Sequence, residues 1–205
     1  MNKKKIIISI LVVITIILIG IFCFYTFGNK TESTPLPAIK EVDNIEKFGY
    51  VLYDNKSELY KTYFEQLKET LNKEEMDEKK YAEVIASLFV IDFYTLNNKV
   101  TNTDIGGLDF IHEEALETFK KSAQDSIYKY IESNVYGDRT QKLPEVKEVN
   151  LVNIDEFNFE SDAIKDEKAY NVILKVAYQE ENTYPKEVRL TLVHDQNKLY
   201  IVEVK

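Results

Sequence analysis

The stretch EKKYAEVIASLFVIDFYTLN, residues 78–97, is the one around which the rest of the domain is expected to pack. Apolar side chains recur in it every three or four residues, which is the period of one face of a helix. They are Tyr81, Val84, Ile85, Leu88, Phe89, Phe93 and Leu96. Val90 and Ile91 widen this face, and a helix that is apolar on most sides has to be covered by other elements. We therefore predict a buried helix over 78–97, with Asp77 as its N-cap.

Two amphipathic helices are predicted on either side of this buried helix. Upstream, apolar residues at helical spacing indicate a helix over 57–71, and the polar residues 54–57 offer an N-cap. Downstream, a loop that contains Gly106 and Gly107 precedes a third helix over 112–133. The apolar side predicted for this third helix comprises Ala115, Leu116, Phe119, Ala123, Ile127, Tyr130 and Ile131.

The periodicity changes from helical to alternating after Pro144. Apolar residues indicate a strand over 146–159, and alternation indicates three more strands over 170–178, 188–193 and 200–204. Short turns join the last three strands, so we expect an antiparallel meander. Helices followed by an antiparallel sheet are typical of the α+β class, here with about three helices on one face of a curved sheet of about four strands.

The N-terminal segment IIISILVVITIILIGIFCFYTF, residues 6–27, carries no charge. A helix of that length would be about 33 Å long, enough to cross the hydrocarbon core of a bilayer. Three lysines precede it, and this excess of positive charge predicts that residues 1–5 stay in the cytoplasm. We predict a single-pass cell-membrane protein with a signal anchor that contacts the lipid bilayer over 6–27, a tether over 28–40 and an extracytoplasmic domain over 41–205. Cleavage of the segment as a signal peptide is the alternative.

Composition restricts the partners of the domain. Hydrophobic residues make up 44% of the 205 residues, with 14 tyrosines and 11 phenylalanines, which suits one domain with a substantial core. The net charge is −9, and leaving out the three N-terminal lysines makes it −12. Such an acidic chain argues against binding to nucleic acid, whose affinity depends on phosphate contacts. The only cysteine is Cys23, so no disulfide is expected in the domain.

The run FVIDFYTLNN (89–98), the Gly106-Gly107 loop and the C-terminal strands within 169–204 carry a resemblance to a known fold. Three helices followed by a strongly bent antiparallel sheet resemble the cone-shaped NTF2-like fold. A short N-terminus, one membrane helix and such a domain also resemble the layout of VirB8-like proteins of conjugation and type IV secretion systems. The resemblance implies an interaction or scaffold domain within such an assembly. NTF2-like domains also include enzymes and ligand binders, so this fold does not determine the function.

Asp92 is the candidate for ligand chemistry, because it stands within the most apolar helix of the domain. A buried carboxylate has to be paired, hydrogen-bonded or protonated. In an NTF2-like cone it would face the cavity, with Tyr94 or Tyr81 nearby for acid–base chemistry. The alternatives are that Asp92 points to solvent or ties its helix to the Gly106-Gly107 loop.

The other polar residues indicate no catalytic set, and we expect no enzyme, no cofactor and no metal site. His112 begins the sequence HEE, which lacks the second histidine that a metal-binding helix needs four residues after the first. His194 precedes a predicted hairpin turn and has no distinctive neighbours in the sequence.

The loop 136–146 is the candidate for partner binding, through Arg139, Leu143 and Pro144. The alternative is an ordinary connection from helix to sheet. The favoured function is an interaction or scaffold domain that contacts other membrane proteins or a second copy of itself. The alternative function is a small-molecule-binding or enzymatic NTF2-like domain with a pocket around Asp92.

Overall fold

The computed structural model describes residues 15–22 and 37–205. The chain divides into two compact units, Met1–Pro35 and Leu36–Lys205. In the first unit, residues 15–22 form a helix whose side chains are exposed. All the labelled helices and strands belong to the second unit, which is called the domain from here on.

The prediction of a membrane-spanning helix over 6–27 is wrong where the structure describes it. Among residues 15–22 and 37–205, no helix is long and apolar enough to span a membrane. The rest of the predicted segment, the predicted cytoplasmic residues 1–5 and most of the tether lie outside the described residues. The predicted single-pass topology and cell-membrane location are corrected on this finding.

Three α-helices of the domain begin close to the positions that the sequence predicts. Their bounds are α2, Glu58–Leu71; α3, Glu78–Tyr94; and α4, Glu113–Asp125. The Ser57 hydroxyl and the Asp77 carboxylate each accept a hydrogen bond from the backbone N–H three residues later, at 3.2 and 3.0 Å. These two side chains therefore satisfy N–H groups that the first turns of α2 and α3 leave without partners.

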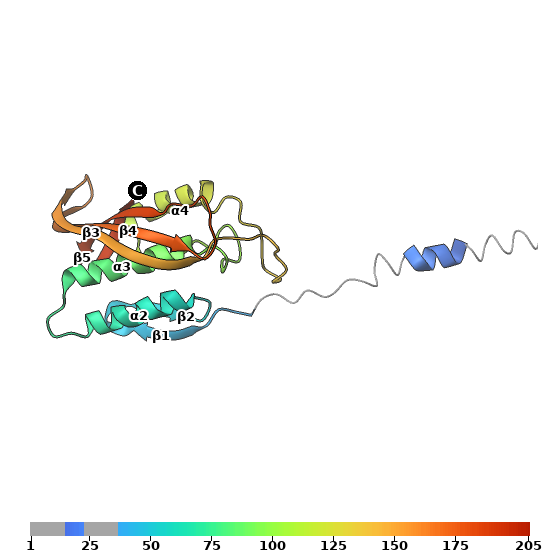
Figure 1. Cartoon of the computed structure of the whole chain (residues 1–205), viewed down its shortest axis with the longest axis horizontal. Helices are drawn as coiled ribbons and strands as arrows, with labels where there is room; N and C mark the ends of the chain where they lie inside the picture. Colours follow the sequence, from blue (N-terminus) through green and yellow to red (C-terminus); the bar gives the residue numbers. More distant parts are fainter. Residues whose placement is uncertain (1–14, 23–36) are drawn as a thin grey trace, which may run out of the picture. The chain divides into compact units, whose positions relative to one another are not determined.

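α3 is the central layer of the domain. Thirteen of its 17 residues are buried, and these include every residue from Val84 to Tyr94. α2 and the N-terminal hairpin lie on one side of α3, and the larger sheet lies on the other (Figure 1). Because α3 is covered on both sides, its sequence is apolar almost all round instead of along one stripe.

Two antiparallel sheets complete the domain. The elements are β1, Glu41–Ile45; the 3-10 helix η1, Glu46–Phe48; β2, Tyr50–Tyr53; the 3-10 helix η2, Leu108–Phe110; β3, Val146–Glu160; β4, Lys165–Tyr178; β5, Glu187–Asp195; and β6, Lys198–Val204. β1 and β2 form an antiparallel hairpin. β3, β4, β5 and β6 form a meander in chain order. The domain is therefore α+β with a four-stranded antiparallel sheet.

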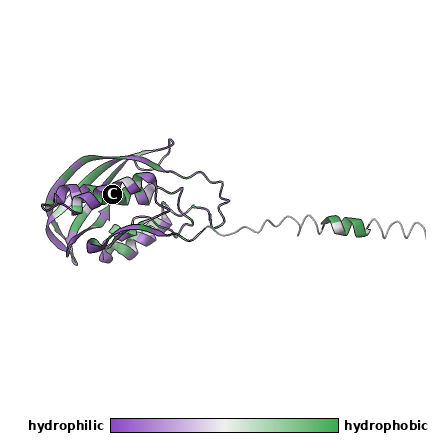
Figure 2. Cartoon of the chain, turned by 90° about the horizontal axis from the view of Figure 1, so that it is seen from below, coloured by the Kyte–Doolittle hydropathy of each residue, from purple (hydrophilic) through white to green (hydrophobic). Residues whose placement is uncertain are grey.

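One face of the four-stranded sheet packs against α3 through alternate residues of its central strands. The buried residues on this face include Val172, Leu174, Val176, Val188, Leu190 and Leu192. Hydrophobic and hydrophilic residues alternate along the strands accordingly (Figure 2). The register of β3 against β4 shifts three times, and β5 pairs only with residues 170–175 of β4. The far end of the β3–β4 hairpin therefore extends beyond the rest of the sheet.

The third helix is shorter than predicted. α4 ends at Asp125, and turns follow it where the sequence predicts helix up to residue 133. Tyr130, which the spacing places on the apolar side, is 75% exposed, and Tyr128 is fully buried instead. The other six residues of the predicted apolar side are buried or packed against the core. The Tyr128 hydroxyl donates to the Phe93 carbonyl at 2.7 Å and accepts from the Gly106 N–H at 3.0 Å. These tertiary contacts outweigh the helical periodicity.

Candidate functional site

Asp92 forms two buried salt bridges in the last turn of α3, where its side chain is only 6% exposed. One carboxylate oxygen lies 2.8 Å from Lys99 Nζ, and the other lies 2.7 Å from Lys56 Nζ. The second oxygen also accepts a hydrogen bond from the Gly107 N–H at 2.7 Å. Asp92 therefore joins α3 to the turn before α2 and to the loop before η2.

The charges around Asp92 keep it ionised. Burial by itself raises the pKa of the Asp92 carboxyl, but Lys99 and Lys56 outweigh burial, and the net pKa lies well below the ordinary range. A general acid or base works best with a pKa near the working pH. The Asp92 carboxylate is thus suited to holding three segments together rather than to exchanging protons with a substrate.

Tyr81 and Tyr94, the predicted partners of Asp92, are not among the groups that bind its carboxylate, which are Lys56, Lys99 and the Gly107 N–H. Tyr81 stands eleven residues earlier on the same helix, about 16 Å away along the axis, and its hydroxyl lies 2.6 Å from that of Tyr50. Tyr94 is only two residues from Asp92, a spacing that places two side chains on different faces of a helix. Tyr94 packs edge-on against Phe93, and burial raises the pKa of Tyr94 to about 12.

Both histidines lie near carboxylates at the end of the sheet where β5 turns into β6. His194 Nδ1 is 2.9 Å from an Asp166 oxygen, and its Nε2 is 3.8 Å from a Glu78 oxygen. His112 Nε2 is 3.9 Å from an Asp195 oxygen. Within residues 15–22 and 37–205, no group of three or more His, Cys, Asp or Glu side chains is placed to hold a metal ion.

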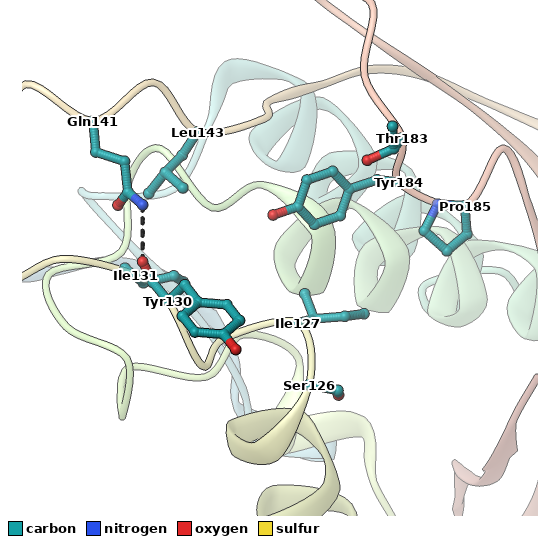
Figure 3. Close-up of a pocket in the computed structure, with 9 residues that line it drawn as sticks. All are labelled: Ser126, Ile127, Tyr130, Ile131, Gln141, Leu143, Thr183, Tyr184 and Pro185. Atoms are coloured by element: carbon teal, nitrogen blue, oxygen red, sulfur yellow. Dashed lines mark hydrogen bonds between the residues drawn. The ribbon is translucent and has the colours of Figure 1, made fainter.

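A groove lies where the turns after α4, the loop before β3 and the β4–β5 turn meet (Figure 3). Its cavity of about 340 Å³ is lined by Ser126, Ile127, Tyr130, Ile131, Gln141, Leu143, Thr183, Tyr184 and Pro185. We call this the tyrosine groove. Tyr130 and Ile127 face Leu143 and Tyr184 across the cavity (Figure 3). Gln141 stabilises the wall that contains Tyr130, because its Nε2 donates a hydrogen bond to the Tyr130 carbonyl at 2.8 Å.

A second cavity of about 370 Å³ continues the tyrosine groove, since Leu143 and Tyr184 line both. Its charged lining residues are Glu145, Glu180, Glu181 and Lys142. Glu180 lies 4.0 Å from Lys142, and their side chains are 76% and 87% exposed, so water screens this pair strongly. The second cavity is therefore polar and is lined by more carboxylates than ammonium groups. We call it the acidic end of the groove.

The three residues predicted to bind a partner have different places in this site. Leu143 lines the tyrosine groove and its acidic end, and Pro144 lines the acidic end. Arg139 lines neither cavity. Its guanidinium donates to the carbonyls of Asn97, Lys99 and Glu132, at 2.7, 2.8 and 3.1 Å. Arg139 thus holds the loop in position beside the cavity.

Sequence reasoning missed the two tyrosines that form the walls of the groove. The spacing of Tyr130 predicts that it lies on the buried side of a helix. Tyr184 lies in a segment for which the sequence predicts only a turn. The sequence feature that could have indicated this groove is the Tyr184-Pro185 pair, because a bulky aromatic residue beside proline in a polar turn has no core position to fill.

Comparisons of the chain with protein-family models, with curated proteins and with solved structures found no match.

Proposed function

We propose that the domain is a protein-interaction module whose tyrosine groove holds an extended segment of a partner protein. The segment carries a bulky apolar side chain with a basic side chain next to it. The apolar side chain packs between Tyr130 and Tyr184, and the basic side chain lies at the acidic end of the groove.

The observation that carries this proposal is the exposed aromatic wall of the groove. Tyr130 is 75% exposed although it borders a cavity lined mainly by apolar side chains. Tyrosines at interfaces supply a large contact area together with a hydroxyl that can stay hydrated, and they are frequent among the residues that dominate binding energy. The groove is built from loops on a rigid core, where binding residues are concentrated in proteins.

Charge supports the basic part of the ligand. Three carboxylates line the acidic end against the single ammonium group of Lys142, and the Arg139 guanidinium is already bound to three backbone carbonyls. The net charge of the chain, −9, also favours the approach of basic partners.

The size of the site limits the strength of binding. Cavities of about 340 and 370 Å³ accommodate a few side chains rather than a large folded surface. An interface of this kind buries less than roughly 1,200 Å², the range of weak and transient complexes. We therefore infer reversible recognition of a short segment.

The order of elements supports the proposal that the domain is an NTF2-like scaffold, because buried α3 precedes an antiparallel meander. A role in a conjugation or secretion assembly rested on a layout with a membrane helix, which is corrected above, so the partner is defined here by its chemistry. A small-molecule pocket around Asp92 has no support in the geometry, since Lys56, Lys99 and Gly107 surround that carboxylate.

Selection of random displayed peptides against the full-length chain tests this function. Enriched peptides are then titrated against Tyr130→Ala and against Tyr136→Ala as a matched control. Tyr136 is also exposed, at 51%, but it does not line the groove. We expect the enriched peptides to pair apolar with basic residues, and to bind Tyr130→Ala at least about tenfold more weakly. Failure to enrich any peptide, or equal losses in both variants, would refute the proposal.

A further inference from the structure

β6 is the last strand of its sheet, and only the first part of its outer edge is covered. Ile111 pairs with Ile201 in a single parallel bridge, and the His112 N–H donates to the Ile201 carbonyl at 2.9 Å. This pairing stops because α4 begins at the next residue, Glu113. Among residues 37–205, no strand pairs with the outer edge of β6 beyond Ile201.

Val204 directs its backbone hydrogen-bonding groups toward this open edge. Arg189 of β5 and Lys205 exchange two backbone hydrogen bonds, each of 2.8 Å. In an antiparallel ladder, such a pair alternates with a pair whose N–H and C=O groups point away from each other. Leu190 and Val204 are the next pair along. The N–H and C=O of Val204 therefore point away from β5 and are available to another strand.

A second groove runs along the open edge, between β6 and α4. Its cavity of about 470 Å³ is lined by Ile111, Ala115, Thr118, Phe119, Ser122, Ile201, Val202, Glu203, Val204 and Lys205. Ala115 and Phe119 are half-buried, so part of their apolar surface faces the groove. The small side chains of Thr118 and Ser122 leave space beside them. Only Ala123 of α4 is fully buried, which shows how much of this helix is open to contact.

We propose that this β6–α4 groove accepts one extended segment of a partner protein as an additional strand of the sheet. The backbone of the segment pairs with Val204 and continues the line of pairing that Ile111 begins. Its alternate side chains are apolar and pack on Phe119 and Ala115, because successive residues of a strand point to opposite faces. Strand addition to an exposed sheet edge is a recurrent mode of peptide recognition, in which main-chain hydrogen bonds give affinity and side-chain pockets give specificity.

The charges at the groove favour an uncharged occupant. Glu203 is the only acidic side chain among the lining residues. Its carboxylate is already bound by Lys205 Nζ and Thr191 Oγ1, each at 2.9 Å. The lining is otherwise apolar or hydroxyl-bearing, so a neutral segment complements it, whereas a charged side chain would lose water without gaining a partner. This distinguishes the β6–α4 groove from the tyrosine groove, whose occupant is basic.

A Val204→Pro variant of the full-length chain separates docking from folding. Proline removes the one N–H that points to the open edge and leaves the Arg189–Lys205 hydrogen bonds intact, and edge strands tolerate proline at such positions. The probe is a short labelled peptide of alternating valine and threonine with blocked ends, titrated by fluorescence anisotropy. We expect it to bind the wild-type chain and to bind Val204→Pro and Phe119→Ala at least about tenfold more weakly. Hydrogen exchange at the Val204 amide should slow when the peptide is bound.

Two controls accompany these titrations. The same peptide with N-methyl groups on alternate residues should not bind, and Tyr130→Ala should bind the unmodified peptide as the wild type does. If Val204→Pro fails to fold, the affinity of Phe119→Ala for the peptide is compared with that of the wild type. Absence of binding to the wild type, or unchanged affinity in the folded variants, overturns the proposal. Dimerisation of the wild-type chain that Val204→Pro abolishes would assign the edge to a second copy, and would overturn it as well.

Discussion

Replacing Asp92 with asparagine should strongly destabilise the domain without changing its shape. Asparagine has almost the same size, and its side-chain oxygen can still accept the hydrogen bond from the Gly107 N–H. What is lost is the negative charge between Lys56 and Lys99. Their side chains are 15% and 4% exposed, so neither ammonium group can be fully rehydrated where it lies.

The magnitude follows from this geometry. Removing one partner of a buried ion pair lowers the free energy of unfolding by about 3–5 kcal/mol, because the remaining charge is left buried and uncompensated. Here one substitution leaves two such charges, so the upper part of that range is expected. For a chain of this size, a loss of about 4–5 kcal/mol corresponds to a fall in Tm of roughly 8–20 °C.

Thermal and urea unfolding of the full-length chain, followed by circular dichroism, measures this effect. Asp43→Asn is the matched control, since Asp43 pairs with Lys68 at 2.5 Å but both side chains are about one-third exposed. That control should lose several times less stability, because water screens surface pairs. Adding Lys99→Met to Asp92→Asn should recover part of the loss by removing one of the uncompensated charges. If Asp92→Asn were no less stable than Asp43→Asn, the account of Asp92 as a buried structural tie would be wrong.

Three further predictions concern the same region. Gly106→Ala should lower the free energy of unfolding by at least about 2 kcal/mol, because a Cβ at this position would lie 2.2 Å from the Asp92 carbonyl oxygen. Urea unfolding measures this loss. Tyr128→Phe should cost about 1–3 kcal/mol in the same assay, because the Gly106 N–H and the Phe93 carbonyl both lose a buried partner. The difference in stability between wild type and Asp92→Asn should shrink below about pH 4. Folding lowers the pKa of Asp92, so the stabilisation that its charge provides is complete above the pKa of the unfolded chain and is lost as the pH falls toward the pKa of the folded domain. Unfolding both proteins at pH 7 and at pH 3 tests this.

The local elements of the domain could be read from the sequence, because their signals lie within a few residues of one another. α3 was predictable from the spacing of apolar residues and from the Asp77 cap, and the central strands from alternation such as Val172, Leu174 and Val176. Asp92 also stood out as a charge inside an apolar run. The segment 6–27 shows the limit of such predictions, since apolar length alone predicted a membrane helix, whereas no helix among residues 15–22 and 37–205 is long and apolar enough to span a membrane.

The sequence by itself thus determined the helices, the meander and the unusual position of Asp92, because periodicity and capping act over one or two turns of chain. Only the tertiary structure decided what these residues contact. Lys56 and Lys99 reach Asp92 from segments 36 residues before it and 7 residues after it. Tyr130 and Tyr184 meet at one groove only because α4 ends at Asp125 and the β4–β5 turn folds back beside it. Pairings of this kind depend on how the layers pack, and no spacing along the chain encodes them.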